Sequence, residues 1–383
     1  MCSFLYNKCR YPGISTELAN SVKLIKGVKK MKIAILGGGY GGTRIINTLL
    51  GYHLPKEVEL ILIDRTPYHS FKTEFYALAA GTVSDKDVRS PFPKHDQLRI
   101  VIDEILSVDP NKNTINLRGN DPVVYDYLVV GLGCEDHYHG TEGAKEFTHS
   151  IQTISKSRRT FEALNNIKGY GTATIVGAGL SGVELVAELR ESRPDLNIQL
   201  LDRGDTILRP FHRKVQQHAT KWLESHDIKI IHNSHVDYVE KGAVCNNGVC
   251  LLSDSIVWTA GVRPNRIVRS MPFTKDKQER IVIDEYHRVP SHPNVFVVGD
   301  CASLPLSPSA QLAQQQGSQI AAILFSLIKK EELKSPGDIK LKGTLASLGK
   351  VDGFAEIGKM PVTGWFARFA KSGVLWLHKR HTD

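Results

Sequence analysis

The sequence predicts a doubly wound α/β fold made of two similar units, with the second unit inserted in the first. Short apolar runs typical of strands alternate with segments of helical spacing along most of the 383 residues. Two glycine-rich turns stand about 140 residues apart, and each lies between a strand-like run and a helical segment. This long-range repeat predicts two parallel sheets, each covered by helices.

The expected elements follow in chain order. Strands are expected at 32–36, 58–63, 123–130, 172–176 and 198–201, helices at 43–50 and 182–190, and sheet-edge strands near Ile230, Val244 and Ile256. The predicted boundaries are a first domain at 31–150, an inserted domain at 151–287, the return of the first domain at 288–350 and a C-terminal amphipathic segment at 351–383. Residues 1–30 are interpreted as a basic extension, either a disordered arm or a segment upstream of a true start at Met31.

The first turn, Gly37-Gly38-Gly39-Tyr40-Gly41-Gly42, has the pattern G-x-G-x-x-G. The first glycine permits the tight turn, the second lets a pyrophosphate approach the backbone, and the third lets the helix pack on the strand. Asp64 lies 22 residues beyond Gly42, where a carboxylate would accept ribose hydroxyls. Strand, glycines, helix and acid together predict a Rossmann-like dinucleotide site.

The second turn, Gly177-Ala178-Gly179-Leu180-Ser181-Gly182, repeats this pattern, and its acid is Asp202. The carboxylate favours NADH. Arg203 follows directly and leaves NADPH open, since an arginine there could hold a 2′-phosphate.

Two dinucleotide sites in one chain are explained economically by a flavin on one and a nicotinamide on the other, with hydride transfer between them. A strand ending in Gly299-Asp300 offers a carboxylate to a flavin ribityl chain. In the helix that follows, Gln311 and Gln315 share one face, and their amides suit quinone carbonyls or the flavin pyrimidine edge.

From Met31 onward the chain resembles the type II NADH dehydrogenases, single-subunit flavoproteins with two dinucleotide-binding domains. The resemblance rests on these motifs: Gly37 to Gly42, Leu-Ile-Asp64-Arg65 with Tyr68-His69, Ala79-Ala80-Gly81, Val-Trp-Thr-Ala-Gly261-Val-Arg263-Pro264-Asn265, Val-Gly-Asp300-Cys-Ala, Ala310-Gln311-Leu-Ala-Gln-Gln315-Gln and Leu345-Ala-Ser-Leu-Gly349. It implies FAD in the first site, NAD(P)H in the second, and a quinone of the menaquinone or ubiquinone class as electron acceptor.

The resemblance also implies the site residues. Cofactor contacts are expected at Gly37, Gly39, Gly42, Asp64, Arg65, Gly133, Asp300, Ala310, Gln311, Gly177, Gly179, Gly182, Asp202 and Gly261. Glu184 is expected at the nicotinamide–flavin junction, and Gln311 and Gln315 along the quinone pocket. No metal site is expected.

Charge and hydropathy favour a peripheral membrane protein on the cytoplasmic side. The net charge is +9, of which residues 1–30 carry +5 and residues 354–383 carry +3, so the remainder offers no basic nucleic-acid surface. No apolar run reaches the ~18 residues of a spanning helix. On a helix over 363–378, one face would carry Trp365, Phe366, Phe369, Gly373, Trp376 and Leu377, with Arg368, Lys371 and Lys379 opposite. That face fits an anionic membrane interface or, alternatively, a homodimer contact or a cap on the core. Members of the family continue with a further amphipathic segment, whereas this sequence ends at Asp383.

The six cysteines are scattered, which predicts reduced thiols. Cys245 and Cys250 have C-x4-C spacing but bracket an Asn-Gly hairpin signal, away from the flavin. Disulfide or sulfide chemistry would fall to Cys134 and Cys301, and we expect none. Two alternatives to a quinone reductase stay open: a diaphorase with a non-quinone acceptor, and a redox-sensing flavoprotein without significant turnover.

Overall fold

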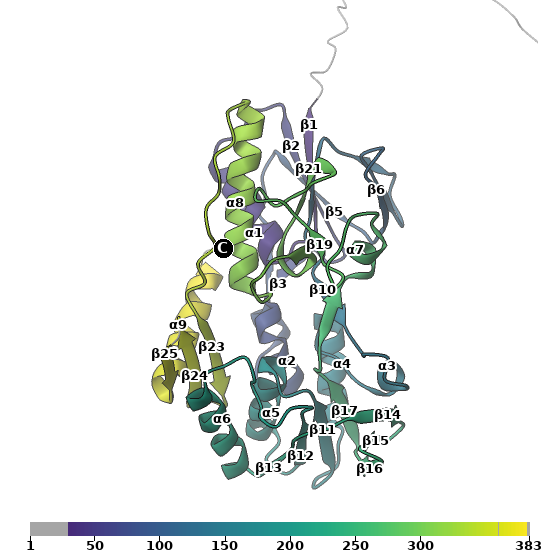
Figure 1. Cartoon of the computed structure of the whole chain (residues 1–383), viewed down its shortest axis with the longest axis vertical. Coiled ribbons are helices and arrows are strands. Elements are labelled where there is room, and N and C mark those ends of the chain that lie inside the picture. The colour runs from purple at the N-terminus through teal and green to yellow at the C-terminus, as the bar shows by residue number, and fades with distance from the viewer. Residues whose placement is uncertain (1–29, 359, 381–383) are drawn as a thin grey trace, which may run out of the picture.

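The computed structural model describes residues 30–358 and 360–380, so the basic extension predicted at 1–30 lies almost wholly outside the described residues. The chain forms two α/β units stacked end to end, with a small C-terminal sheet and helix packed beside the second (Figure 1). The predicted fold class is confirmed.

The first unit is a six-stranded sheet in the order β20-β21-β9-β1-β2-β5. Five of these strands are parallel, and β20 pairs antiparallel at one edge. Its strands are β1 (Met31–Leu36), β2 (Val58–Asp64), β5 (Leu98–Ile102), β9 (Tyr127–Val130), β20 (Arg288–Val289) and β21 (His292–Val297). Helices α1 (Tyr40–Gly51) and α8 (Ala310–Lys329) pack together over one face of it.

The second unit is a four-stranded parallel sheet in the order β13-β12-β11-β17. Its strands are β11 (Thr172–Val176), β12 (Asn197–Leu201), β13 (Ile228–Ile231) and β17 (Ser255–Trp258), and its helices are α4 (Ile154–Asn165), α5 (Leu180–Ser192) and α6 (Arg213–Ser225). All of them fall between β9 and β20 in the chain, so the second unit is inserted in the first.

Two strand expectations were wrong in detail. The run 123–130 forms two strands in different sheets, β8 (Val123–Val124) and β9. The strand is interrupted at residues 125 and 126. There the carboxylate of Asp126 accepts the N–H of Lys32 at 2.7 Å. The Val244 region does not edge the parallel sheet. It forms the central strand β15 (Ala243–Asn246) of a separate three-stranded antiparallel sheet, between β14 (Val236–Glu240) and β16 (Val249–Leu252).

Short elements accompany the two main sheets. They are β3 (Tyr68–Ser70) with β4 (Arg89–Pro91), α2 (Phe75–Ala80), β6 (Ile105–Asp109) and β7 (Thr114–Leu117) with β8, β10 (Cys134–Asp136) with β18 (Val262–Pro264), α3 (Ala144–Phe147), α7 (Arg266–Ser270), and β19 (Ile281–Val282) with β22 (Ala302–Ser303). Three short 3-10 turns complete them: η1 (Lys72–Glu74), η2 (Asp85–Val88) and η3 (Gly299–Cys301).

The C-terminal segment begins with strands. An antiparallel sheet of β23 (Thr344–Leu348), β24 (Asp352–Ile357) and β25 (Met360–Thr363) precedes helix α9 (Trp365–Arg380). Ala346, Leu348 and Phe354 of this sheet belong to the same buried cluster as α2 and α5. The C-terminal sheet is therefore an extension of the second unit's core, and α9 packs on β23 and β24.

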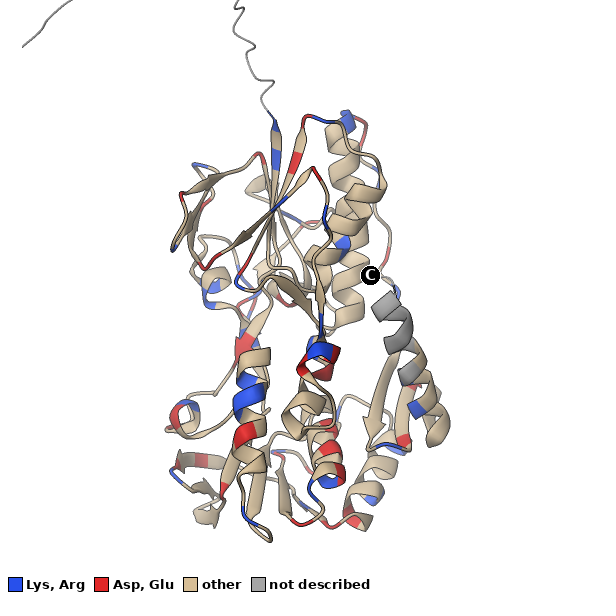
Figure 2. Ribbon diagram, turned by 180° about the vertical axis from the view of Figure 1, so that it is seen from behind, with Lys and Arg blue, Asp and Glu red and all other residues tan. Residues whose placement is uncertain are grey.

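Charged residues of both signs are interspersed along the ribbon of both units (Figure 2). This distribution agrees with the small net charge that the sequence assigns to the region between the two termini.

Candidate functional site

The first glycine turn joins β1 to α1 and excludes side chains at two positions. Gly37 has a φ of +95°, and a Cβ there would lie 2.4 Å from the carbonyl oxygen of Gly131. A Cβ on Gly42 would lie 2.1 Å from the carbonyl oxygen of Gly37. A Cβ on Gly39 would meet no atom within 4 Å. Gly39 is thus the open side of the turn, as a pyrophosphate at the N-terminus of α1 requires.

The second turn joins β11 to α5 and repeats this geometry. Gly177 has a φ of +105°, and a Cβ there would lie 2.6 Å from the Cα of Ala260. A Cβ on Gly182 would lie 2.0 Å from the carbonyl oxygen of Gly177, while one on Gly179 would meet nothing within 4 Å. The two turns therefore offer equivalent anion sites, one in each unit.

Each turn is braced by the acid that the sequence assigned to it. Asp64 Oδ2 accepts the N–H of Gly38 at 2.7 Å, and Asp202 Oδ2 accepts the N–H of Ala178 at 2.8 Å. Because each carboxylate stands at the end of the adjacent parallel strand, it lies beside the turn where a ribose would follow the pyrophosphate.

Two of the other predicted cofactor residues, Gly133 and Gly261, lie beside a glycine turn. Gly133 follows Gly131, which contacts the first turn, and its carbonyl accepts from the Cys301 thiol at 3.5 Å. Gly261 follows Ala260, which contacts the second turn. Ala310 begins α8. Arg65 is exposed and makes no hydrogen bond or ion pair with any described residue.

A lysine that the sequence interpretation did not single out stands beside Asp300. Lys72 Nζ lies 3.9 Å from Asp300 Oδ2 and donates to the Cys134 Sγ at 2.9 Å. Burial disfavours the ammonium form, but Cys134 and Asp300 outweigh it and raise the pKa of Lys72. Burial, followed by the charge of Asp300, raises the pKa of Cys134 to about 12. The group therefore combines an ammonium, a carboxylate and a neutral thiol, which donates weakly to Gln152 Oε1 at 3.8 Å.

Gln316 is a second residue that sequence reasoning missed. Its side chain is completely buried, and its Oε1 accepts the N–H of Gly299 at 2.8 Å. Its Nε2 has no hydrogen-bond partner among residues 30–358 and 360–380. A buried amide donor left open next to Asp300 fits a cofactor that supplies the acceptor. Its place in the Gln-Gln-Gln run was the available signal.

Gln311 and Gln315 bind the chain that follows α8, here called the strap (residues 331–343). Gln311 Oε1 accepts the N–H of Lys342 at 2.9 Å. Gln315 exchanges two hydrogen bonds with the backbone of Lys340, at 2.7 and 3.2 Å. Gln319, one turn further, donates to the carbonyl oxygens of Pro336 and Gly337. One glutamine face therefore binds the strap, which runs alongside α8 (Figure 1).

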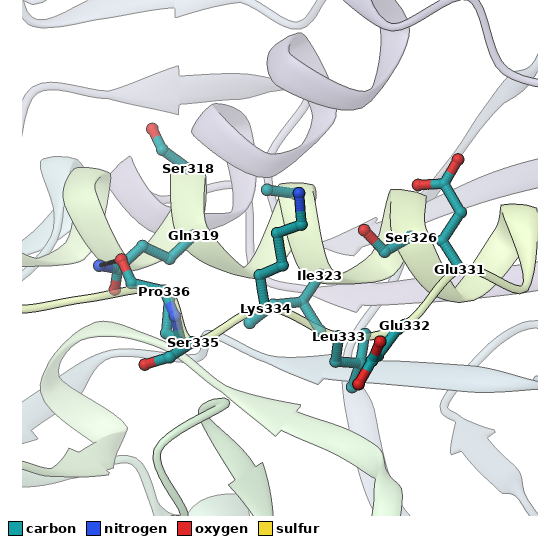
Figure 3. A pocket seen from close by; sticks show the side chains of 11 residues that line it. Ser318, Gln319, Ile323, Ser326, Glu331, Glu332, Leu333, Lys334, Ser335 and Pro336 are labelled. Carbon is teal, nitrogen blue, oxygen red and sulfur yellow. Dashed lines mark hydrogen bonds between the residues drawn. The ribbon is translucent and has the colours of Figure 1, made fainter.

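The strap encloses a pocket of about 630 Å³ against the C-terminal half of α8 (Figure 3). Its lining comes from the strap and from helix residues between Ser318 and Ser326, with Gln319 and Ile323 among them. No residue predicted to bind a cofactor or a quinone lines this pocket, so it is separate from the two glycine turns.

Glu184 lies in a buried polar cluster formed by α2, α5, β23 and α9. Its carboxylate pairs with Lys371 Nζ and accepts the N–H of Ser347 at 3.1 Å. Lys371 also donates to Tyr76 Oη and, at 3.2 Å, to Ser347 Oγ. The exposed fractions of the Lys371 and Glu184 side chains are 8% and 6%. Burial raises the pKa of Glu184, and the lysine and the Ser347 N–H oppose that shift.

Two further acids, Glu74 and Glu188, are buried next to this pair. Burial raises the pKa of Glu74 to about 7, with Lys371 lowering it and Glu184 and Glu188 raising it. Glu74 Oε1 has no hydrogen-bond partner in the part of the chain that the structure describes. Glu74 is therefore a carboxyl group that binds and releases a proton near neutral pH.

The cluster corrects the helical face predicted for α9. Lys371 was expected on the polar side of the helix, opposite the aromatic residues, but its side chain is buried where α9 packs on β23 and β24. The aromatic side is the exposed one, with Trp365, Phe366 and Phe369 exposed to 63%, 63% and 73%. The predicted positions of Trp376, Leu377 and Lys379 lie where side chains are not described. Among the described helices, none has the length and apolarity needed to span a bilayer.

The expectation that all cysteines are reduced was wrong for one pair. Cys245 and Cys250 form a disulfide across the β15–β16 hairpin. The reason is local: the two-residue Asn247-Gly248 turn puts these cysteines directly opposite each other in the antiparallel register. Glu240 lies close to both sulfur atoms.

Comparison with known proteins agrees with this geometry. Residues 31–317 match the family model described as pyridine nucleotide-disulphide oxidoreductase. The chain belongs to this family. It is 48% identical over 351 residues to the NADH dehydrogenase-like protein YutJ of Bacillus subtilis, which covers 91% of this chain and 99% of that protein. It is 27% identical to the type II NADH:quinone oxidoreductase of Staphylococcus aureus, over 89% of this chain and 93% of the relative.

A solved structure of NDH2 from Plasmodium falciparum in complex with NADH has the same fold. The TM-score is 0.79 at 19% identity, over 90% of this chain and 94% of that one. The predicted likeness to type II NADH dehydrogenases is thereby confirmed, and the chain is an oxidoreductase of pyridine nucleotides.

Proposed function

We propose that this protein is an FAD-dependent NADH dehydrogenase that passes two electrons to a quinone at an anionic membrane surface. The observation that carries the proposal is the pair of equivalent turns in two α/β units, one inserted in the other. Each turn has an open middle glycine and a carboxylate that accepts a hydrogen bond from its backbone. Such a pair suits one bound flavin and one exchanging nicotinamide.

The first turn is assigned to FAD. Gly37, Gly39 and Gly42 leave the backbone open to a pyrophosphate, and Asp64 offers its carboxylate to the ribose. Asp300 would bind the ribityl chain, and the open Nε2 of Gln316 would donate to an acceptor of the cofactor. FAD, when bound, supplies the N5 atom that accepts a hydride. The Lys72 ammonium adds positive charge beside this site, which favours a cofactor that gains negative charge on reduction.

The second turn is assigned to NADH. Gly179 leaves the helix N-terminus open to the pyrophosphate, and Asp202 stands ready for the ribose hydroxyls. The relative from Plasmodium was solved with NADH, and the relative from S. aureus is named for its action on NADH and quinone.

Reduction of a quinone to a quinol takes up two protons with the two electrons. Glu74, with a pKa of about 7, and the Glu184–Lys371 pair form a buried store of exchangeable protons between the second unit and the C-terminal helix. Gln311 and Gln315 hold the strap against α8, so the strap would form one wall of a quinone pocket at the N-terminal end of that helix.

Attachment to a membrane is assigned to α9. Trp365, Phe366 and Phe369 are exposed along its first turns, and the last 30 residues carry a charge of +3. Exposed aromatic side chains beside cationic residues are the features by which interfacial helices bind anionic lipid.

Steady-state turnover with different acceptors tests the proposal. With NADH as donor, the expected acceptor is a short-chain menaquinone or ubiquinone analogue, and anionic liposomes should raise the rate. Extraction of the cofactor should release FAD. A colourless protein that binds no flavin would contradict the proposal at its first step.

One observation favours a second candidate, a diaphorase with a non-quinone acceptor. The side-chain amides of Gln311 and Gln315 already bind the strap backbone, which leaves them fewer groups for a quinone. Turnover with ferricyanide but not with quinone analogues, with or without lipid, would support this candidate.

A further inference from the structure

The small antiparallel sheet of β14, β15 and β16 brings three metal-ligating side chains together on one face. Cys245 on the central strand lies directly opposite Cys250 on one side and Tyr238 on the other. Glu240 stands two residues beyond Tyr238 on β14, so it points to the same face. A carboxylate oxygen of Glu240 and the two sulfur atoms all lie within 4.8 Å of one another. The C-x4-C spacing alone does not indicate this cluster, because Glu240 joins it only through the pairing of β14 with β15.

This face of the sheet is open to solvent. Val239 and Val244 point the other way, into a buried cluster of the second unit. Glu240 and Cys250 are exposed, whereas Cys245 is only 1% exposed. An incoming thiolate can therefore reach the sulfur of Cys250, and an ion can reach the carboxylate.

The carboxylate of Glu240 makes no hydrogen bond or ion pair with any residue between 30 and 358 or between 360 and 380. Beside it, the hydroxyl of Tyr238 lies 3.5 Å from the Sγ of Cys250. The cluster thus offers one carboxylate oxygen and two sulfur atoms as ligands. Zn²⁺ binds this mixture of ligands, whereas Mg²⁺ and Ca²⁺ prefer oxygen alone and Cu⁺ prefers sulfur.

The turn between the two cysteines is held by contacts that do not involve the disulfide. Asn247 and Gly248 have φ values of +51° and +75°, as a tight two-residue hairpin turn requires. Asn247 Nδ2 donates to the carbonyl oxygen of Asn233 at 3.0 Å, and the N–H of Gly248 donates to Asp237 Oδ2 at 2.8 Å. The pairing of β15 with β16 therefore persists when the disulfide is reduced, and the two thiols stay opposite each other.

We propose that reduction of the Cys245–Cys250 disulfide turns this face into a zinc site made of two thiolates and the carboxylate of Glu240. This site is independent of the proposed function, since neither glycine turn takes part in it. Two thiolates bound to one zinc ion at about 2.3 Å are about 3.8 Å apart, a separation that directly opposed side chains can adopt.

Reduction requires a dithiol as the co-reactant. The dithiol gives two electrons and two protons and becomes a disulfide, while the S–S bond of the protein becomes two S–H groups. Zn²⁺ then displaces both thiol protons, which pass to water, and forms two Zn–S bonds and one Zn–O bond. A water molecule completes the tetrahedral coordination. A disulfide oxidant reverses the sequence: it takes two electrons from the thiolates and two protons from water, and the S–S bond forms again with release of the zinc ion.

Zinc titration of the full-length, flavin-loaded protein tests the site. One sample is reduced with a phosphine, desalted without oxygen and titrated with Zn²⁺ against a chromophoric chelator, and a second sample keeps its disulfide. The reduced protein should bind one more zinc ion per chain than the oxidised protein. With Co²⁺ in place of Zn²⁺, the difference spectrum should show a cobalt–thiolate charge-transfer band and the strong visible bands of tetrahedral coordination.

Two variants and one control locate the zinc ion. The double variant Cys245→Ser/Cys250→Ser keeps the other four cysteines and should lose the extra zinc ion. Glu240→Gln keeps both thiols and should bind zinc at least about tenfold more weakly, because loss of even an outer-shell partner has an effect of that size. Glu146→Gln removes one negative charge from an exposed position on α3, which packs on β14, and should bind zinc like the wild type.

The zinc site is overturned if the reduced wild type binds no more zinc than the double serine variant, or if the oxidised protein binds zinc equally well. A thiol assay showing that the phosphine leaves the disulfide closed in the folded protein would also overturn it. An unchanged zinc affinity in Glu240→Gln would contradict the three-ligand site. Because Glu240→Gln keeps both cysteines, it provides this test even if the serine variant does not fold.

Discussion

Lys371 of the C-terminal helix and Glu184 of the second unit form a buried ion pair, although they are 187 residues apart in the chain. Ser347 and Tyr76 complete the hydrogen bonding, so residues from four elements meet at one ammonium group. The pair joins α9 to the helix that starts at the second glycine turn. Helix α9 and the second unit are thereby connected through one cluster.

Loss of one partner should destabilise the protein strongly. Lys371→Met leaves the carboxyl of Glu184 buried without its cation, and Glu184→Gln leaves the lysine without its anion. Each should lower the free energy of unfolding by about 3–5 kcal/mol. The double variant should lose less than the sum of the two, since no unpaired charge is left. Denaturant unfolding measures these values.

The exposed pair of Arg118 and Glu104 provides the control for this cycle. Arg118→Met should cost no more than about 1 kcal/mol, because both side chains are solvated. Additive losses at Lys371 and Glu184 would contradict the proposed coupling.

Glu74 should make stability depend on pH. In the folded protein it keeps its proton up to about pH 7, against an ordinary value of 4.5. Since the folded state binds this proton more tightly, the stability that the proton adds is fully present below pH 4.5. It is lost as the pH rises to about 7. Glu74→Gln should therefore match the wild type near pH 4.5 and exceed it at pH 8 by up to about 3 kcal/mol. Parallel stability curves for the two proteins would argue against a neutral Glu74.

Alanine substitutions at the two open glycines, Gly39 and Gly179, should distinguish the two proposed nucleotide sites. Gly39→Ala and Gly179→Ala each add a Cβ that meets no atom within 4 Å, so both variants should fold with a nearly unchanged Tm. Gly39→Ala should lose flavin, which absorbance of the purified protein reports. Gly179→Ala should keep its flavin but bind NADH at least about tenfold more weakly. The same loss of flavin from both variants would count against the assignment of the turns.

The exposed aromatic residues of α9 should carry the membrane contact. The triple variant Trp365→Ala/Phe366→Ala/Phe369→Ala should bind anionic liposomes more than about tenfold more weakly in sedimentation assays. Leu252→Ala, an exposed apolar side chain on β16, serves as the control and should bind like the wild type. Unchanged lipid binding by the triple variant would favour a dimer contact for this face.

Cys134 should be dispensable for NADH oxidation. Burial raises the pKa of its thiol to about 12, so it is not a thiolate at physiological pH even though Lys72 donates to its sulfur. Cys134→Ser should keep the rate within about twofold of the wild type, and Cys301→Ser should do the same because burial raises the pKa of that thiol too. A large loss of the NADH oxidation rate in either variant would support a role for sulfur chemistry.

The sequence predicted those features that depend on local geometry. Gly37 and Gly177 begin G-x-G-x-x-G patterns and have φ values of +95° and +105°, which favour glycine, so the motifs predicted both turns without a structure. The i,i+4 relation of Gln311 and Gln315 was also visible, but the backbone they bind lies in the strap, and no spacing reveals that partner.

The burial of Lys371 could not be predicted in this way. The sequence placed this lysine on the polar side of the helix, opposite the aromatic residues. Here Lys371 is buried because Glu184 and Tyr76, from distant parts of the chain, satisfy its charge and its donors. The disulfide of Cys245 and Cys250 was missed for a different reason. The spacing of the two cysteines was visible in the sequence, but the scatter of all six cysteines favoured reduced thiols.

The central claim is that electrons pass from NADH through the bound flavin to a quinone. An anaerobic titration followed by flavin absorbance tests it most directly. The account predicts that NADH bleaches the flavin band and that a stoichiometric amount of a short-chain menaquinone or ubiquinone analogue restores it within the enzyme's turnover time. A flavin that NADH does not reduce, or that is reoxidised by ferricyanide but not by either quinone, would contradict the account.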